Sequence, residues 1–219
     1  MLRRILATPV AGNALVAGAM LLWLIPAQAG PQSTAPQSPV EVVAQLQQKI
    51  VTVWRSDKGF EQRFESLAPV ITASHDFATM TRFTLGNRWQ ELSPAQREQF
   101  VAIFRRLSIT TYADRFVEYD GERFVQSGHR SLSEDQHLVQ TQLWLSDGTR
   151  IRLDYLLHQQ GGRWTIINVL ADGVSELAIK RSEYTAYIRD HGFAALVQEL
   201  QRKISEMAGE ERTAPSAEP

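Results

Sequence analysis

The chain has 219 residues, of which 43% are hydrophobic and 21% charged, and its formal net charge at pH 7 is −1. This composition is typical of a globular protein and predicts one folded domain, with or without helical additions. The near-neutral charge argues against a nucleic-acid partner, because proteins that bind nucleic acids normally present a basic field. The sequence contains no cysteine, so disulfide bonds are excluded.

The first part of the chain has the pattern of a secretory signal peptide. Two arginines precede an apolar stretch that is densest over residues 14–25 and closes on the small-x-small sequence Ala27-Gln28-Ala29. An uncleaved membrane anchor would fit the same length, but Asn13 interrupts the apolar run and the ending favours removal. We therefore predict that residues 1–29 are a signal peptide cleaved after Ala29.

The rest of the chain divides into a folded domain between two polar ends. Residues 30–38 and 209–219 contain proline and have almost no large apolar side chains, which is typical of a disordered linker and tail. The folded domain is predicted over residues 39–208, and we expect it to be a monomer. An exported chain without cysteine cannot be a lipoprotein, so the periplasm of a two-membrane bacterium is its simplest location.

Three helices are predicted in the first part of this domain. The first begins with a capping box, in which Ser38 is the cap, Pro39 takes the first helical position and Glu41 follows at the third. Gly59 separates it from the second helix, and the third stops near Gly86. Apolar residues recur at helical spacing along each: Val43, Leu46, Ile50 and Val53; then Phe60, Phe64, Leu67 and Ile71; then Phe77, Met80 and Phe83.

A longer helix is predicted after Ser93, with Pro94 next and Gln96 closing a second capping box. The simplest interpretation of an amphipathic helix of this kind is that it packs into the core. Its main apolar stripe and the residues that widen it are Phe100, Phe104 and Leu107, then Val101, Ile109, Tyr112 and Phe116.

Strands are predicted from Gly121 onward, where alternation replaces helical spacing. The first is short, at Phe124 and Val125, and three longer ones follow over residues 137–145, 150–158 and 164–170. The sequence SDGT supplies a tight turn between the second and the third. Four consecutive strands with short connections indicate an antiparallel meander.

The last hairpin carries apolar residues on both of its faces, whereas a half-buried sheet normally keeps one face polar. Leu156 points away from its apolar neighbours on the same strand. Strict alternation puts Trp164 and Ile166 on one face and Ile167 and Val169 on the other. The apolar face must be covered, either by helices that fill the space or by helices that leave a cavity for an apolar ligand. The residue pattern is the same in both cases, so it does not distinguish a filled core from a ligand cavity.

Two further helices are predicted after Gly173, with an interruption at His191-Gly192. The second of them has the clearest apolar stripe of the chain, formed by Phe193, Leu196, Val197, Leu200, Ile204 and Met207. Helices, then a meander, then helices predict an α+β fold, in which a twisted antiparallel four-stranded sheet packs with N- and C-terminal helices.

Motifs for catalysis and metal binding are scarce. The five histidines show no metal-ligand spacing, and we expect neither a metal nor a cofactor. Ser175 lies in GVSEL, which lacks the second glycine of a nucleophile elbow, so we interpret it as a helix cap. Asp154 and Tyr155 point to opposite faces of their strand and cannot serve one site. We therefore predict no catalytic residues and no enzymatic activity.

Two stretches resemble a known family. FTLGNRWQELSPAQREQFVAIFRRLSITTYADRFVEY (Phe83–Tyr119) resembles the MlaC (toluene-tolerance) family in its Leu-Gly, Trp, Pro-containing helix start, Gln-x₃-Phe-x₃-Phe and Tyr. GGRWTIINVLADGVSELAIKRSEY (Gly161–Tyr184) is similar to the family's Trp strand, Gly-Val-Ser and Arg-Ser-x-aromatic segment. Asn168, where the family often has Asp, and SEL in place of SL are departures. DGVSELAIKRSEY and LDYLLH look closest to the hopanoid-biosynthesis-associated branch, HpnM.

The resemblance implies a periplasmic lipid carrier whose sheet and helices enclose an apolar pocket for the acyl chains of a phospholipid, or for a hopanoid. Its implied partners are an inner-membrane transporter, either an MCE-type ABC complex or another lipid exporter, and an outer-membrane acceptor complex. An adaptor that carries nothing and a lipid-modifying enzyme are the alternatives. Plain core packing is the alternative for each predicted pocket residue, and it carries more weight for those of the helix: Leu143, Leu153, Tyr155 and Ile166 on the strands, faced by Phe100, Phe104, Tyr112 and Phe116.

Overall fold

A computed structural model describes residues 37–56 and 58–209, which form the predicted α+β fold. The predicted signal peptide, its cleavage site, and residues 30–36 and 210–219 lie outside the described residues. Within the described ranges, every helix is too short or too polar to span a bilayer. The helices are α1 (Pro39–Trp54), α2 (Phe60–Ser74), α3 (Phe77–Leu85), α4 (Arg88–Glu91), α5 (Pro94–Arg115), α6 (Glu176–His191) and α7 (Phe193–Ala208).

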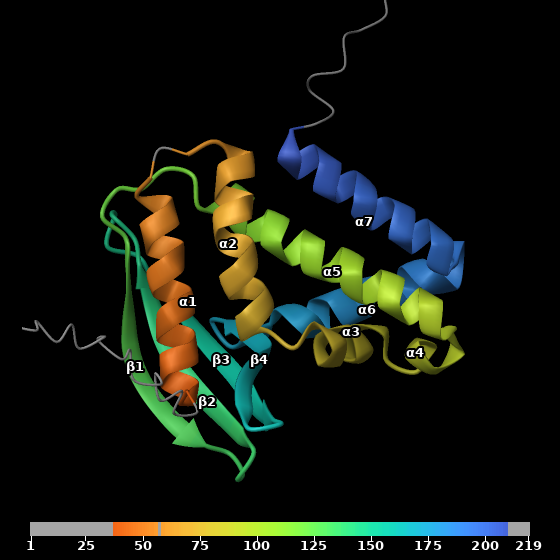
Figure 1. The fold of residues 1–219 in the computed structure, drawn as a ribbon, viewed down its shortest axis with the longest axis horizontal. Coiled ribbons are helices and arrows are strands. Elements are labelled where there is room, and N and C mark those ends of the chain that lie inside the picture. The colour runs from red at the N-terminus through yellow and green to blue at the C-terminus, as the bar shows by residue number, and fades with distance from the viewer. Residues whose placement is uncertain (1–36, 57, 210–219) are drawn as a thin grey trace, which may run out of the picture. The chain divides into compact units, whose positions relative to one another are not determined.

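The sheet is antiparallel, and its strands lie side by side in the order in which they occur in the chain (Figure 1). They are β1 (Arg123–Ser131), β2 (Gln136–Trp144), β3 (Arg150–Gln160), β4 (Arg163–Ala171) and β5 (Val174–Ser175). The meander is confirmed, but the structure adds a fifth strand and gives the first one nine residues. β5 has only two residues, which pair with the end of β4 and are too few to show an alternation.

A bulge in β4 corrects the predicted assignment of its faces. Leu156 pairs with Asn168 but Leu157 pairs with Ile166, so Ile167 has no partner on β3. One extra residue reverses the alternation beyond it. Val169 therefore lies on the same face as Ile166, and not opposite to it as strict alternation predicts.

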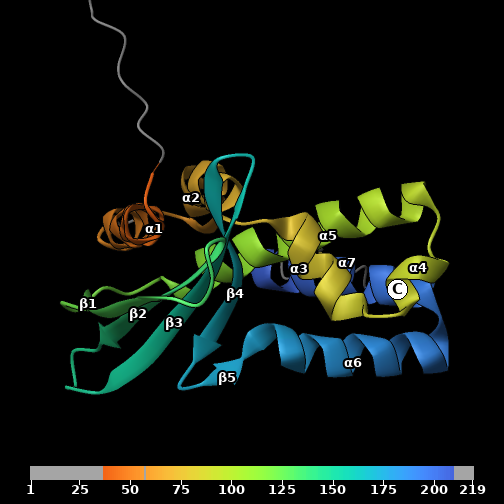
Figure 2. The same ribbon diagram turned by 90° about the horizontal axis from the view of Figure 1, so that it is seen from below.

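We call the face of the sheet that looks toward α1 the inner face. Gln47 of α1 reaches it and contacts Thr141 and Tyr155. α1 and α2 both lie on this side of the sheet (Figure 2). The register assigns these apolar residues to the inner face: Val139, Leu143, Leu153, Tyr155, Leu157, Ile166 and Val169. The apolar residues of β3 and β4 are thus mostly collected on one face, as a half-buried sheet requires.

The remaining helices form a layer beside the sheet. α5 packs against α2 and α7, and α3 packs against α5 and α6. The loop between α2 and α3 joins this layer to the sheet, because His75 forms a parallel bridge with Ile166 and the Asp76 amide donates to the Ile166 carbonyl oxygen at 3.0 Å. The helices and the inner face therefore share one continuous core.

The predicted helix starts are confirmed by their hydrogen bonds. Ser38 and Ser93 each form a complete capping box, with Glu41 and Gln96 as the returning side chains. Ser175 caps α6 by accepting a hydrogen bond from the Ala178 amide at 3.1 Å. The four-residue helix α4 was not predicted, since so short a helix carries no periodic signal.

Candidate functional site

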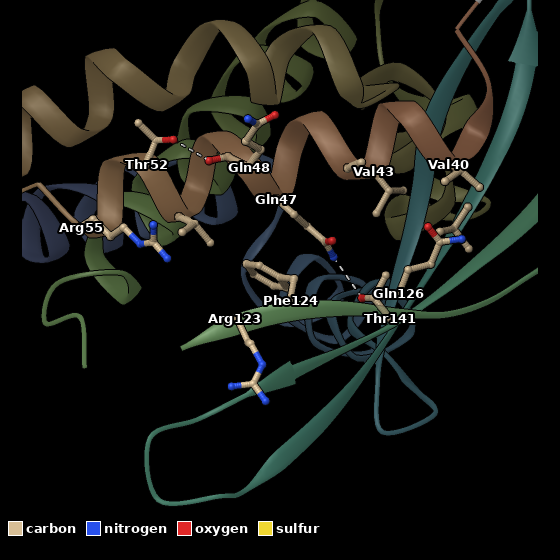
Figure 3. Close-up of a pocket in the computed structure, with 13 residues that line it drawn as sticks. Val40, Val43, Gln47, Gln48, Thr52, Arg55, Arg123, Phe124, Gln126 and Thr141 are labelled. Atoms are coloured by element: carbon tan, nitrogen blue, oxygen red, sulfur yellow. Dashed lines mark hydrogen bonds between the residues drawn. The ribbon is translucent and has the colours of Figure 1, made fainter. Parts of the chain in front are cut away.

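A groove runs between α1 and the first two strands (Figure 3). Its volume is about 700 Å³, which is within the range of small-molecule sites in proteins. Val40 and Arg55 lie at the two ends of α1, so the groove follows the whole helix over about 22 Å at 1.5 Å per residue. Its lining residues are Val40, Val43, Ala44, Gln47, Gln48, Val51, Thr52, Arg55, Arg123, Phe124, Gln126, Val139 and Thr141.

The groove has apolar residues along both of its walls and one cationic side chain, Arg55, at one end. Val40 and Val43 line the end at the start of α1, and Figure 3 shows Gln126 on the same side of the groove. Arg55 lies at the end where α1 stops, whereas Arg123 directs its side chain to the opposite face of the sheet, where it stacks on Trp144. None of the thirteen described lining residues is acidic. The cavity is therefore suited to a long molecule with an apolar body.

A small polar network closes the middle of the groove. Gln47 Nε2 donates to Thr141 Oγ1 at 3.0 Å and to Tyr155 Oη at 3.3 Å, and Thr141 Oγ1 donates to the Leu153 carbonyl oxygen at 3.0 Å. Burial raises the pKa of the Tyr155 phenol to about 12, and the bond from Gln47 opposes this only in part. The phenol stays neutral at physiological pH, so the network is uncharged.

Replacing Gln47 tests this network. We expect Gln47→Leu to lower the free energy of unfolding by about 1–3 kcal/mol, because it leaves the buried Tyr155 hydroxyl without its partner. Adding Tyr155→Phe removes the stranded hydroxyl, and the double variant should be more stable than Gln47→Leu alone. Urea unfolding of Gln47→Leu, Tyr155→Phe and the double variant measures this coupling, and strictly additive losses of stability would contradict it.

The predicted strand residues lie one row behind the groove. Leu143 is the cross-strand partner of Phe124, and Leu153 that of Thr141. Tyr155 is likewise the partner of Val139, which also lines the groove. Ile166 lies one strand further, opposite Leu157, and both are fully buried. Three of the four predicted residues thus adjoin the lining, and none is part of it.

The predicted residues of the long helix fall into two groups. Phe100 and Phe104 are fully buried in the helical layer, where their rings contact those of Tyr184, Phe193 and Phe77. Tyr112 and Phe116 lie nearer the groove. Their rings stack with centroids 5.9 Å apart, and Phe116 packs edge-on against Trp54 of α1 at 4.7 Å. Burial and, to a smaller extent, the nearby Tyr155 raise the pKa of the Tyr112 phenol.

The lining residues of α1 were not among the predicted site residues. Gln47 occupies the position four residues after Val43, inside an otherwise apolar stripe. A polar side chain in a stripe that faces the core needs a buried partner, and this was the available signal. Its partners are 94 and 108 residues away in the sequence, so no local pattern identifies them.

The sheet brings together histidines that sequence spacing does not relate. His129 Nε2 and His137 Nδ1, on β1 and β2, are 2.7 Å apart, and His158 Nε2 is 2.9 Å from Asp76 Oδ2. Across residues 37–56 and 58–209, no group of three or more His, Cys, Asp or Glu side chains is arranged to hold a metal ion.

The sequence matches the family described as "MlaC protein" over residues 41–202. The chain belongs to the MlaC family. The match extends from the first turn of α1 to the last turns of α7 and so includes both walls of the groove. The predicted family is confirmed, and the assignment to its HpnM branch stays a prediction.

Two known proteins resemble this MlaC-family chain. One is the intermembrane phospholipid transport system binding protein MlaC of Haemophilus influenzae, which is 21% identical over 126 residues. That alignment covers 56% of this chain and 59% of the relative. The other is the structure of a phospholipid-binding protein from Ralstonia solanacearum in complex with a phospholipid. It has a TM-score of 0.67 and 19% identity, covering 76% of this chain and 97% of that one, and it shows a shared fold.

Proposed function

We propose that this chain is a lipid carrier that holds an acyl chain, or another long apolar body, in the groove between α1 and the sheet. The observation that carries the proposal is the groove itself, which is long, has valines on both walls and a phenylalanine on β1, and contains no acidic residue among those described. Burial is worth about 0.8 kcal/mol per CH₂ group, so a lipid cannot cross water without such a shelter.

The comparisons support this function through the names of the two similar proteins, one a phospholipid transport binding protein and the other a phospholipid-binding protein. By analogy we propose the periplasm as its location and a phospholipid or a hopanoid as its cargo. The proposed partners are an inner-membrane transporter, either an MCE-type ABC complex or another exporter, and an outer-membrane acceptor. The carrier role is physical, with no cofactor and no catalytic step.

We further propose that a second apolar chain reaches the row of residues behind the groove. Leu143, Leu153 and Tyr155 adjoin its lining, and the bonds of Gln47 hold the intervening wall closed. Tyr112 and Phe116 lie beyond them. In this proposal, release of Gln47 lets an acyl chain pass from the groove to these residues. Three other predicted pocket residues are fully buried among core side chains: Phe100, Phe104 and Ile166. We propose that they pack behind the residues named above and support them.

Native mass spectrometry and solvent extraction of the purified chain test the carrier function directly. We expect one lipid molecule to co-purify with each folded chain and to be released by organic solvent. An empty chain that nevertheless binds a membrane transporter tightly would favour an adaptor. Chemical conversion of added lipid over time would instead indicate an enzyme, and either result would overturn the proposal.

A further inference from the structure

We propose that Gln47 selects the cargo by offering a hydrogen-bond acceptor to a hydroxyl group within the apolar body of the lipid. The cargo class that fits this acceptor is a lipid whose acyl chain, or other long apolar body, carries a hydroxyl near its middle. The inference rests on the proposed carrier function and deepens it, because it names a chemical group of the cargo and the atom that recognises it, Gln47 Oε1.

Two of the polar residues that line the groove are buried. Gln47 is 7% exposed and Thr141 is 1% exposed. The other polar residues of the described lining are exposed: Gln48, Thr52, Arg55, Arg123 and Gln126. Exposed polar groups keep their contact with water when a ligand binds, whereas buried ones lose it unless the ligand replaces the hydrogen bond. The buried pair is therefore where the lining can discriminate between ligands.

The hydrogen bonds of the network fix which way the Gln47 amide points. Thr141 Oγ1 donates its one proton to the Leu153 carbonyl oxygen, so it can only accept from Gln47. The amide therefore turns Nε2 toward Thr141, at 3.0 Å, and the same NH₂ group donates to Tyr155 Oη at 3.3 Å. Both donors of the amide are used by the protein, and Oε1 takes part in neither bond.

Gln47 Oε1 receives no hydrogen bond from the described part of the chain. Among the described residues, the side-chain atom that is both sealed from solvent and without a partner is Asp154 Oδ1, so Gln47 Oε1 keeps an opening. Gln47 lines the groove, and Figure 3 shows its side chain pointing from α1 across the groove to Thr141. The groove thus presents an acceptor that the protein itself does not use.

The place of Gln47 on α1 predicts where the cargo carries its hydroxyl. Gln47 lies about 10 to 12 Å from Val40 and from Arg55, at 1.5 Å per residue, and these residues mark the two ends of the groove. A methylene group placed against Oε1 removes its water and returns no hydrogen bond, whereas a hydroxyl group replaces the bond that was lost. The recognised hydroxyl therefore belongs near the middle of the chain, whichever end enters first.

A competition between two lipids measures this selectivity. The delipidated full chain is incubated with vesicles that contain equal amounts of two phosphatidylethanolamines, one with a stearoyl chain and one with 12-hydroxystearoyl in its place. The chain is re-isolated, and mass spectrometry gives the ratio of bound hydroxylated to plain lipid. We expect this ratio to be about tenfold higher for the wild type than for Gln47→Leu, because the variant offers the buried hydroxyl no acceptor. Both proteins meet the same vesicles, so effects of the hydroxyl on the vesicle cancel.

Two controls separate recognition by Gln47 from other effects of the substitution. Gln47→Leu/Tyr155→Phe removes the stranded phenol hydroxyl without restoring the acceptor, so it should show the same low ratio as Gln47→Leu. Gln45→Leu is the matched control, because Gln45 is an exposed residue of α1 that does not line the groove, and it should keep the wild-type ratio.

A lipid with a 2-hydroxystearoyl chain tests the position of the hydroxyl. Its hydroxyl adjoins the ester group and so lies away from the middle of the chain, where Gln47 reaches the groove. We expect the wild type and the double variant to bind this lipid and the plain lipid in the same ratio.

The outcomes separate this recognition from the carrier function. Equal ratios for the wild type and the double variant, or an equal effect of Gln47 on both hydroxylated lipids, overturn the recognition and leave the carrier intact. A wild type that takes up neither lipid contradicts the proposed function itself. Circular dichroism checks the folding of the variants. If no variant of Gln47 folds, the wild type still decides, because it should prefer the 12-hydroxystearoyl lipid to the 2-hydroxystearoyl lipid.

Discussion

Ala44→Trp should reduce the lipid bound per chain by at least about tenfold. Ala44 lies in the middle of α1, lines the groove and is exposed, so an indole at this position would occupy the space that we assign to the acyl chain. Substitutions of exposed residues usually change the free energy of unfolding by about 0.5 kcal/mol or less, so the fold should persist. Solvent extraction followed by mass spectrometry gives the lipid content, and urea unfolding gives the stability.

Gln45→Trp is the matched control for this substitution. Gln45 is the next residue of α1 and is also exposed, but it does not line the groove. The same indole placed there should leave the lipid content unchanged. If both variants keep their lipid, the cargo lies elsewhere than in the groove. A loss of lipid in both would point to a general effect of a tryptophan on α1.

The second prediction concerns His75, which should make the folded state less stable as the pH falls below about 6.5. Burial lowers the pKa of His75 to about 4, and its hydrogen bond to the Ile71 carbonyl oxygen opposes this only in part. Between about pH 4 and pH 6.5, His75 is protonated in the unfolded chain but not in the folded chain. We expect a loss of about 3 kcal/mol in the free energy of unfolding between pH 6.5 and pH 4, and no contribution above pH 6.5.

His75→Asn should remove this part of the pH dependence. The asparagine amide can replace Nδ1 as donor to the Ile71 carbonyl oxygen but does not titrate. Burial alone would raise the pKa of the neighbouring Asp76, but hydrogen bonds from Thr79 and the charge of His158 outweigh it and hold the pKa below its ordinary value. Asp76 thus keeps its charge through the window that we assign to His75.

Urea unfolding from pH 4 to pH 8 gives the stability of the wild type and the variant. The difference between them should change with pH along the titration of His75. His191→Asn serves as the control, because His191 is exposed at the end of α6, and this variant should follow the wild type. If the free energies of unfolding of His75→Asn and the wild type depend on pH in the same way, protonation of His75 does not destabilise the folded state, and the prediction is wrong.

The sequence predicted those parts of the fold that depend on neighbouring residues. Helix starts at Ser38 and Ser93 follow from capping boxes, and the break between α6 and α7 follows from Gly192. The bulge at Ile167 could not be foreseen, because alternation assumes an unbroken register and one unpaired residue reverses it. That single residue explains most of the apolar side chains that strict alternation predicted on both faces of the last hairpin.

The site was harder to predict than the fold, because it depends on which helix covers which strand. The sequence indicated the inner face of β2 and β3, and the structure places Leu143, Leu153 and Tyr155 next to the groove. The residue pattern did not favour α1 over α5 as the helix that forms the wall of the groove opposite the sheet. Both helices are amphipathic, and the choice is made by contacts such as that of Gln47 with Thr141, which are distant in sequence.

The position of β1 affects how the groove can open. β1 is an edge strand that pairs with β2 only, and its pairing shifts register between Gln126 and Gly128. One wall of the cavity is therefore tethered along a single edge and already bent, whereas β2 and β3 are each held by two neighbours. In the proposed carrier, a lipid tail enters or leaves when β1 flexes, while the hydrogen bonds of the rest of the open sheet stay in place. Loading and unloading, as we propose them, then need no movement of whole domains.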